Sequence, residues 1–311
     1  MMFDPRGIVA VDKRGDRVLF LDADTLAIVG ELRDMPALPH ELAISPDRAF
    51  AYVPAYGDGA HGDNPHPNHR LSVIDLARRT RLCDIDLHPL EAPHTLRFGP
   101  DGNLYVACEN SAAIAVIDGR DHRLIDKIDT GSANSHRLAI LDDPALICTD
   151  NEEDASISIL DLAERRRIAT ISLATPIAGI EIVPAEARLY CSDAAAPRLL
   201  PISLASLQAE PAIPLEGHRK PCQVVRLSPD GRQLIVIGDH EPVVSLIDLE
   251  SRAQRAIGVG AKPMDGGFHP DGRTFLLANE EDGTVSEIDL AAGLVRRTVR
   301  VGEGCETLAY F

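Results

Sequence analysis

The chain alternates short hydrophobic runs with polar turns, and one such pattern recurs along its whole length. An alternating apolar strand ends in Asp, and after a turn a second strand follows, as in VLFLDADTLAIVGEL around Asp22. The spacing is about 42 residues, which is typical of repeat architectures. The seven copies are centred on Asp22, Asp75, Asp118, Asp161, Ser203, Asp248 and Asp289.

A second element lies between these copies and predicts a tight hairpin. It consists of an apolar strand, a turn with Pro-Asp-Gly or a close variant, and another apolar strand, as in LRFGPDGNLYVACE and VVRLSPDGRQLIVIGD. Proline fixes one backbone angle, and glycine supplies the positive φ that such turns need. Each repeat therefore contains four strands, A to D. The sequence predicts an all-β, seven-bladed β-propeller of four-stranded blades.

The two ends of the chain indicate how the ring closes. The first three expected strands correspond to strands B, C and D of one blade, and the last corresponds to a lone strand A. Their expected bounds are Ile8–Asp12, Arg17–Asp22, Leu26–Leu32 and Glu306–Phe311. We therefore expect blade 1 to combine residues 305–311 with residues 8–32, and residues 1–311 to form a single propeller domain.

The repeats are similar to a known family. The Val-Ile-Asp strand, as in LSVIDL, and the Ser-Pro-Asp-Gly hairpin, as in LSPDGRQLIVIGD, resemble the YVTN family of β-propeller repeats. The resemblance covers essentially the whole chain. It implies the seven-bladed fold and leaves function open, because such propellers serve as enzymes, ligand binders and scaffolds.

Composition narrows the classes of partner. The net charge of −17 argues against nucleic acid and anionic membranes and favours cations or metal ions. No run approaches 18 apolar residues, and the start lacks the pattern of a secretory leader. Six scattered cysteines without a CxxC pair fit core thiols in a reducing compartment. We expect a monomer or weak oligomer in the cytoplasm, or in the periplasm if a leader has been removed.

Candidate metal ligands occupy one equivalent position in four successive blades. Aligning the repeats on the hairpin turn places Glu306, His40, His94 and His136 where strand A begins, at the mouth of the central channel. Blades 5 to 7 have Ala178, Gln223 and Met264 at this position. Three imidazoles and a carboxylate suit a divalent transition metal such as zinc, iron or copper, with Glu306 as ligand or general base. The alternative is a polar channel lining that holds water.

A histidine-rich insertion belongs to blade 2. The loop at residues 57–69, GDGAHGDNPHPNH, connects strands B and C, and such loops share one rim with the entry to strand A. It carries His61, His66 and His69, which we expect to act as catalytic groups from a lid over the mouth. A solvated insertion without function is the alternative.

Two functions follow as hypotheses. The first is a metal-dependent enzyme that acts on a small cationic or neutral molecule; the arrangement is similar to axial metal sites in carotenoid-cleaving oxygenases and copper-dependent methanethiol oxidase. These enzymes have added motifs that the chain lacks, so an oxidoreductase, a lyase and a lactonase-like hydrolase all stay open. The second hypothesis is a non-catalytic ligand- or protein-binding propeller scaffold.

Overall fold

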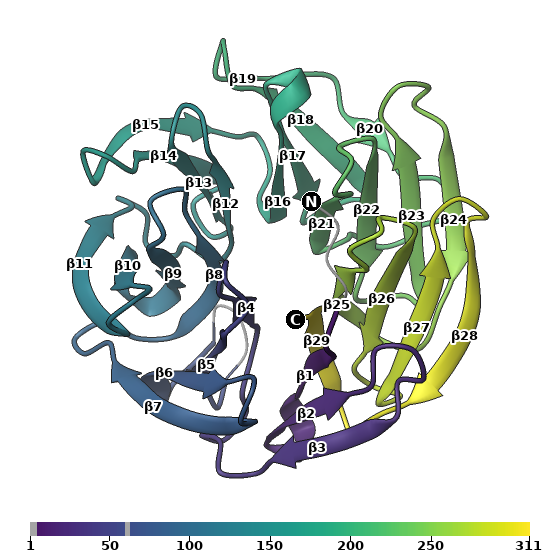
Figure 1. Ribbon diagram of the computed structural model, residues 1–311. Coiled ribbons are helices and arrows are strands. Elements are labelled where there is room, and N and C mark those ends of the chain that lie inside the picture. The colour runs from purple at the N-terminus through teal and green to yellow at the C-terminus, as the bar shows by residue number, and fades with distance from the viewer. Residues whose placement is uncertain (1–4, 60–62) are drawn as a thin grey trace.

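Seven β-sheets stand around a central channel like the blades of a propeller (Figure 1). The computed structural model describes residues 5–59 and 63–311. Within these residues each sheet is antiparallel, with strands A, B, C and D in order from the channel outward. Six sheets have four strands, and blade 5 has five because its outer strand is divided. The predicted all-β, seven-bladed propeller is confirmed.

The strands follow the repeat in the sequence. Blade 1 consists of β29 (Cys305–Tyr310), β1 (Ile8–Asp12), β2 (Arg17–Leu21) and β3 (Ile28–Leu32), and blade 2 of β4 (Ala43–Ile44), β5 (Phe50–Gly57), β6 (Pro67–Asp75) and β7 (Thr80–Asp86). Blade 3 consists of β8 (Pro93–Phe98), β9 (Leu104–Cys108), β10 (Ala113–Asp118) and β11 (Arg123–Asp129), and blade 4 of β12 (Leu138–Leu141), β13 (Leu146–Asn151), β14 (Ser156–Asp161) and β15 (Arg166–Ser172). Blade 5 consists of β16 (Ile177–Val183), β17 (Arg188–Asp193), β18 (Arg198–Ser203), β19 (Gln208–Ala209) and β20 (Ile213–Pro214). Blade 6 consists of β21 (Val224–Leu227), β22 (Gln233–Gly238), β23 (Val243–Asp248) and β24 (Gln254–Gly258), and blade 7 of β25 (Pro263–Phe268), β26 (Thr274–Asn279), β27 (Thr284–Asp289) and β28 (Leu294–Arg300). Three short 3-10 helices lie in turns: η1 (Lys13–Gly15), η2 (Glu109–Ser111) and η3 (Pro184–Glu186).

The ring closes between the two ends of the chain. Strand β29, yellow in Figure 1, lies beside the purple β1, and the register pairs Ile8 with Tyr310. Cys305 and Leu308 of β29 are buried in one hydrophobic cluster with side chains of blades 1 and 7. The expected composition of blade 1 is thus confirmed, and hydrogen bonds rather than a covalent link hold the ring shut.

Strand A of each blade serves both the core and the channel. The residue at its start, aligned with His40, is called the entry position below. Two residues later an apolar side chain packs between blades, and in six blades it belongs to a different buried cluster: Leu308, Leu42, Leu96, Leu138, Ile180 and Val225. The residue three positions after the entry position lines the far end of the channel in six blades: Ala309, Ala43, Arg97, Glu181, Arg226 and Gly267.

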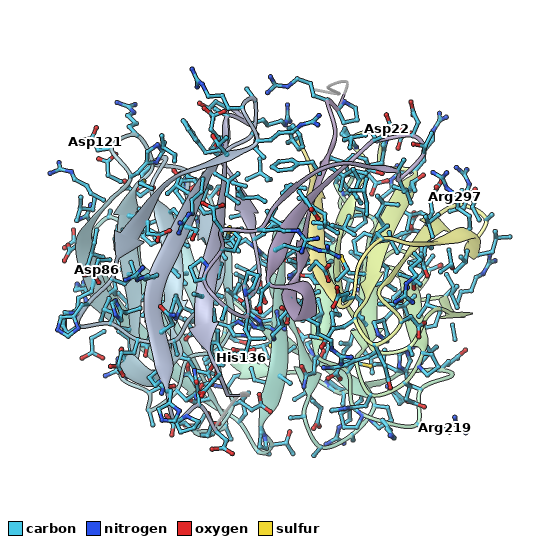
Figure 2. The ribbon with its side chains drawn as sticks, turned by 90° about the horizontal axis from the view of Figure 1, so that it is seen from below. Asp22, Asp86, Asp121, His136, Arg219 and Arg297 are labelled. Carbon is cyan, nitrogen blue, oxygen red and sulfur yellow. The ribbon has the colours of Figure 1, made fainter. Side chains whose placement is uncertain are left out.

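The channel has two different mouths. The histidine mouth is the end where the strands A begin and the B–C loops turn; it contains His40, His94 and His136. The arginine mouth is the opposite end, among the A–B turns, and contains Arg97 and Arg226. In the side view of Figure 2, His136 lies toward the lower rim, whereas Asp22, in a C–D turn, lies on the upper rim.

The cysteines of the fold are packing residues. All six cysteines are free thiols, and all except the half-buried Cys83 are buried. Cys222 and Cys305, next to the entry positions, point into hydrophobic clusters, as expected for packing residues. In the part of the chain that the structure describes, no helix is long and apolar enough to cross a membrane.

Candidate metal centre

Three histidines form an arc at the histidine mouth. His40 precedes β4, His94 lies in β8 and His136 precedes β12, so each belongs to the inner edge of a different blade. Their backbones are held by strand B of the same blade: the amides of His40 and His136 donate to the carbonyls of Pro54 and Asp150 at 2.9 and 3.1 Å. All three side chains are buried. Adjacent blades therefore fix the imidazoles against one another.

The imidazoles meet through their Nε2 atoms. Nε2 of His94 lies 2.7 Å from Nε2 of His40 and 3.0 Å from Nε2 of His136. The ring centroids are 4.4 and 4.2 Å apart, with the planes tilted by 71° and 63°. The structure thus brings the three histidines together at one point of the rim, and their binding of a metal ion together with Glu306 stays a prediction.

The outer nitrogens of these rings face carboxylates. Nδ1 of His40 lies 2.8 Å from Glu306 Oε2. Nδ1 of His94 lies 3.1 Å from Thr95 Oγ1, whose hydroxyl donates to Glu41 Oε1 at 3.1 Å. Glu41 in turn accepts from the guanidinium of a neighbouring arginine. The hydroxyl of Thr95 is committed as a donor, so Nδ1 of His94 carries the proton and its Nε2 offers a lone pair.

Burial keeps His94 uncharged. The imidazole is enclosed, and its pKa lies well below the ordinary value of 6.5 because burial disfavours the charged form. The neighbouring His136 and His40 and the positive charges of Arg137 and Lys13 lower the pKa further. At neutral pH the ring is therefore in the form that binds a metal ion.

A lysine stands at the Glu306 end of the arc. Lys13, in the 3-10 helix η1 of the B–C loop of blade 1, donates to Glu306 Oε1 at 3.0 Å and lies 2.8 Å from His40 Nδ1. Burial acts to raise the pKa of Glu306, but the charges of His40 and Lys13 outweigh it and lower the pKa to about 2. Glu306 is thus an ionised carboxylate with two partners.

The carboxylate on the other side of the arc comes from blade 3. Glu109, at the start of η2, is fully buried, and its Oε1 accepts from Asn134 Nδ2 at 2.9 Å. One ligand atom from each of His94, Glu109 and His136 lies within 4.8 Å of the other two. Two imidazoles and one carboxylate at this spacing are a suitable donor set for a transition metal ion.

Tyr56 covers the arc from strand β5. Its ring stacks on that of His40, with the ring centroids 5.3 Å apart, and meets the ring of His94 edge-on, with the centroids 5.4 Å apart. Burial raises the pKa of its hydroxyl, and the negative charge of Glu109 together with a hydrogen bond to that carboxylate raises it further. The hydroxyl therefore stays protonated and holds Glu109 in place.

The insertion of blade 2 is shorter than the sequence suggests. Strand β5 extends to Gly57 and β6 begins at Pro67, so only residues 58–66 connect them. His66 is exposed and pairs with Asp58, and His69 pairs with Asp86 on the neighbouring strand D, so neither contacts the arc in the described residues. His61 lies outside the described residues.

Three groups at this mouth were not assigned a site role from the sequence. Lys13 and Glu109 lie in B–C turns, where charged residues are ordinary, and Tyr56 lies at the start of the insertion of blade 2. A signal for Lys13 and Glu109 exists nonetheless, because B–C loops share the rim with the entry positions. The sequence does not show how far a long side chain such as Lys13 extends toward the neighbouring blade, and this information was needed to place it in the site.

Comparison with known proteins gives fold relatives only. Neither a family description nor a curated protein matches the sequence, so the YVTN resemblance is not confirmed. Among solved structures, Kuenenia stuttgartiensis hydrazine synthase is similar with a TM-score of 0.77 at 19% identity, over 90% of this chain and 91% of that one. The dihydro-heme d1 dehydrogenase NirN, in complex with DHE, is similar with a TM-score of 0.66 at 17% identity, over 96% of this chain and 65% of that one. Both are enzymes by name, and at these identities they establish the seven-bladed propeller fold alone.

Proposed function

We propose that the protein is a metal-dependent enzyme that acts on a small molecule at the histidine mouth. The observation that carries the proposal is the meeting of three buried imidazole nitrogens. Nε2 of His94 lies within 3.0 Å of Nε2 of both neighbouring histidines. Each such nitrogen offers either a proton or a lone pair, so two adjacent rings either share an N–H···N hydrogen bond or direct two lone pairs at one cation. We assign the second arrangement to His94 and His136, with a divalent transition metal ion as the cation.

The outer contacts of the rings support the same assignment. Metal-binding histidines commonly donate the other ring N–H to a carboxylate or a hydroxyl, which turns the lone pair toward the metal. His94 has this arrangement through Thr95 and Glu41. His40 faces Glu306 at 2.8 Å, and His136 faces Glu152 at 3.8 Å.

We assign the metal to His94, His136 and Glu109. These three residues place their ligand atoms within 4.8 Å of one another. Two histidines and a glutamate with a fourth position left open are characteristic of catalytic rather than structural zinc sites. The assignment keeps two of the sequence-based ligands and replaces Glu306 by Glu109, because Glu306 is committed to Lys13 and His40.

His40 and Glu306 then serve proton transfer. With a pKa of about 2, Glu306 is a weak base at neutral pH. It is suited to orienting the His40 ring, and His40 is the proton acceptor in the proposal. The metal, when bound, supplies a Lewis acid and an activated water. This set of groups suits hydrolysis or elimination on a small molecule.

Metal content tests the assignment. Protein purified without a histidine tag should contain about one transition metal ion per chain by elemental mass spectrometry. His94→Ala and Glu109→Gln should each weaken metal binding by about tenfold or more, because each removes a ligand. Glu306→Gln should lower activity more than metal content, because it acts through His40.

The matched control is His240→Gln. His240 is an exposed histidine in the B–C loop of blade 6, on the same rim, and its loss should leave the metal content unchanged. Loss of metal from Glu306→Gln but not from Glu109→Gln would overturn the ligand assignment. Metal-free protein that binds no transition metal on titration would overturn the enzyme proposal itself.

A second candidate is a non-catalytic propeller that binds a ligand or a protein at this rim. The observation in its favour is Lys13, whose ammonium at 2.8 Å already gives His40 a cationic neighbour. In that case the arc is a chain of hydrogen bonds that begins at Lys13. Metal titration separates the two candidates, because the scaffold requires no stoichiometric metal.

A further inference from the structure

The arginine mouth contains a cavity of about 610 Å³. This volume lies in the range of pockets that bind small molecules. Strand A of six blades contributes to the wall. The room arises because three of the wall positions carry small residues, Ala43, Gly267 and Ala309, where larger side chains would fill the channel.

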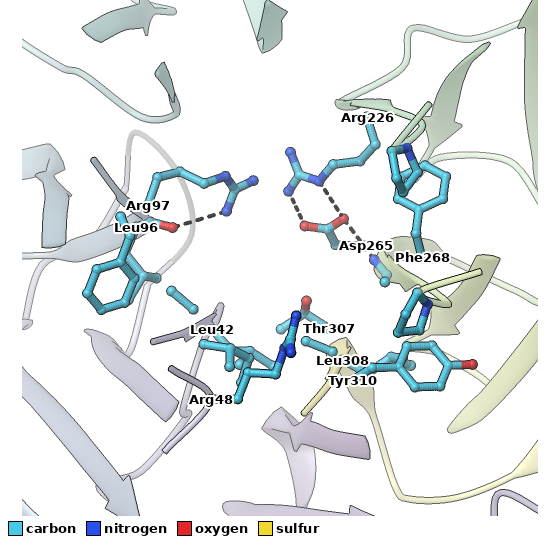
Figure 3. Close-up of a pocket in the computed structure, with 18 of the residues that line it drawn as sticks. Leu42, Arg48, Leu96, Arg97, Arg226, Asp265, Phe268, Thr307, Leu308 and Tyr310 are labelled. Atoms are coloured by element: carbon cyan, nitrogen blue, oxygen red, sulfur yellow. Dashed lines mark hydrogen bonds and ion pairs between the residues drawn. The ribbon is translucent and has the colours of Figure 1, made fainter. Parts of the chain in front are cut away.

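Three arginines line this cavity, Arg48, Arg97 and Arg226, and the guanidinium groups of Arg97 and Arg226 extend toward each other from two sides (Figure 3). Arg226 of β21 is paired with Asp265 through two of its nitrogens. Arg97 of β8 has no carboxylate within ion-pair distance among the described residues, and its guanidinium donates only to the carbonyl of Leu96, at 3.0 Å. A charged group with five donors thus faces the cavity with most of its donors uncommitted.

The electrostatics of Arg97 leave room for an anion. Burial lowers the pKa of Arg97, and the positive charge of Arg226 lowers it further, while Glu41, Asp265 and Glu181 act in the opposite sense. Glu181, on the same wall, has a raised pKa because it is buried, although Arg226 and Arg97 lower it. The donors available to a bound anion are those of Arg97, because Arg226 is already paired with Asp265.

Much of the remaining wall is apolar, although Ser45, Arg48, His269 and Thr307 also line it. Leu42, Phe98, Phe268, Leu308 and Tyr310 line the cavity around the arginines. Leu42, Phe268, Leu308 and Tyr310 surround the opening in Figure 3. A charged headgroup alone would leave these side chains in water, so the wall favours a ligand that also has a hydrocarbon part.

We propose that the arginine mouth binds a small organic carboxylate, with the carboxylate on Arg97 and the apolar part against the aromatic and aliphatic wall. A guanidinium matches a carboxylate through two parallel hydrogen bonds, which gives orientation as well as affinity. This site is separate from the histidine mouth and requires no metal. It gives the two ends of the channel different ligand classes.

Binding to chelator-treated protein tests the proposal apart from the metal centre. The probes are benzoate, hexanoate, inorganic phosphate and the neutral isostere benzamide, measured by saturation-transfer NMR and isothermal titration calorimetry. The carboxylates should bind, and benzamide and phosphate should bind at least about tenfold more weakly. Arg97→Gln should lower carboxylate affinity about tenfold or more, and Ala43→Leu should block binding by filling the cavity.

Three further variants complete the design. Arg120→Gln, an exposed arginine in a turn of the same blade, is the matched control and should leave affinity unchanged. Glu181→Gln should maintain or tighten benzoate binding, because it removes a negative charge; loss of benzoate binding would contradict a site based on positive charge and overturn the proposal. Arg97→Lys should bind the carboxylates with an affinity between those of the parent and Arg97→Gln. It replaces Arg97→Gln as the test if that variant does not fold. Equal affinity for benzoate and benzamide would also overturn the proposal. So would carboxylate binding that is unchanged in the Arg97 variants.

Discussion

His94 is enclosed by two other imidazoles, and its protonation is coupled to the stability of the whole channel. The folded protein keeps this ring neutral, since its pKa lies well below 6.5. The unfolded chain binds a proton at this residue as the pH falls through about 6.5. Acidification from neutral pH therefore favours the unfolded state, and stability rises with pH through this window.

We predict that His94→Gln flattens this pH dependence. In chelator-treated protein, the free energy of unfolding of the parent should fall with decreasing pH below about 6.5, with a contribution from His94 of up to about 1.4 kcal/mol per pH unit. The variant should lack this contribution. Urea unfolding between pH 7.5 and pH 5 measures the slope, and His240→Gln is the control. Parallel curves for parent and variant would contradict the prediction.

For individual residues, the sequence predicts which positions face the channel better than it predicts which side chains contact one another. His40, His94 and His136 could be predicted to converge because the repeat fixes the entry position in every blade. Lys13 and Glu109 could not be assigned, because they lie in turns whose sequences, Lys-Arg-Gly and Glu-Asn-Ser, are common at the surface. Whether such a side chain turns inward depends on packing between blades, which the repeat pattern does not encode.

Among the elements, β29 closes the ring. Its hydrogen bonds to β1 complete blade 1, and Cys305, Leu308 and Tyr310 bury apolar surface against neighbouring strands. The split between the two ends of the chain was predictable, because the first and last strands are incomplete parts of one repeat. The broken outer strand of blade 5 was not, since QAEPAIP differs from the other repeats only by its prolines and its length.

We predict that deletion of residues 305–311 opens the ring. The loss of buried apolar surface and of one strand pairing should lower the free energy of unfolding by at least about 5 kcal/mol. Thermal unfolding followed by circular dichroism measures the effect, and a synthetic peptide of residues 303–311 should restore part of it. Leu294→Ser, on the exposed outer strand β28, is the control and should change stability little. A truncated protein that melts at the parent temperature would refute closure by this strand.

We also predict that the connection between β5 and β6 supports the metal centre without supporting the fold. Replacement of residues 58–66 by Asn-Gly keeps the hairpin but removes Asn64, whose side chain donates to the carbonyl of Tyr56 at 3.0 Å. Tyr56 covers the arc and holds Glu109, so metal affinity should fall about tenfold while the melting temperature changes by only a few degrees. Unchanged metal affinity in the folded variant would show that the connection is dispensable.

At the scale of the whole molecule, the channel joins two chemically different ends. The carboxylates of Glu109 and Glu306 and the imidazoles favour cations at the histidine mouth. The arginine mouth favours anions although the chain as a whole carries a net charge of −17. The fold permits this because each strand A alternates between packed and channel-facing positions. The channel-facing residues at one end can therefore be charged or polar without disturbing the packing between the blades.

The pairing of β29 with β1 also constrains how the protein is made. On a ribosome, β1 emerges long before its partner β29. Until β29 emerges, the inner edge of β1 presents unpaired backbone groups, and the edge of blade 7 lacks its neighbour. The nascent chain therefore passes through an open arc with two exposed ends, a state prone to association with other chains. Chaperones that shield strand edges should matter most for this protein before β29 is made.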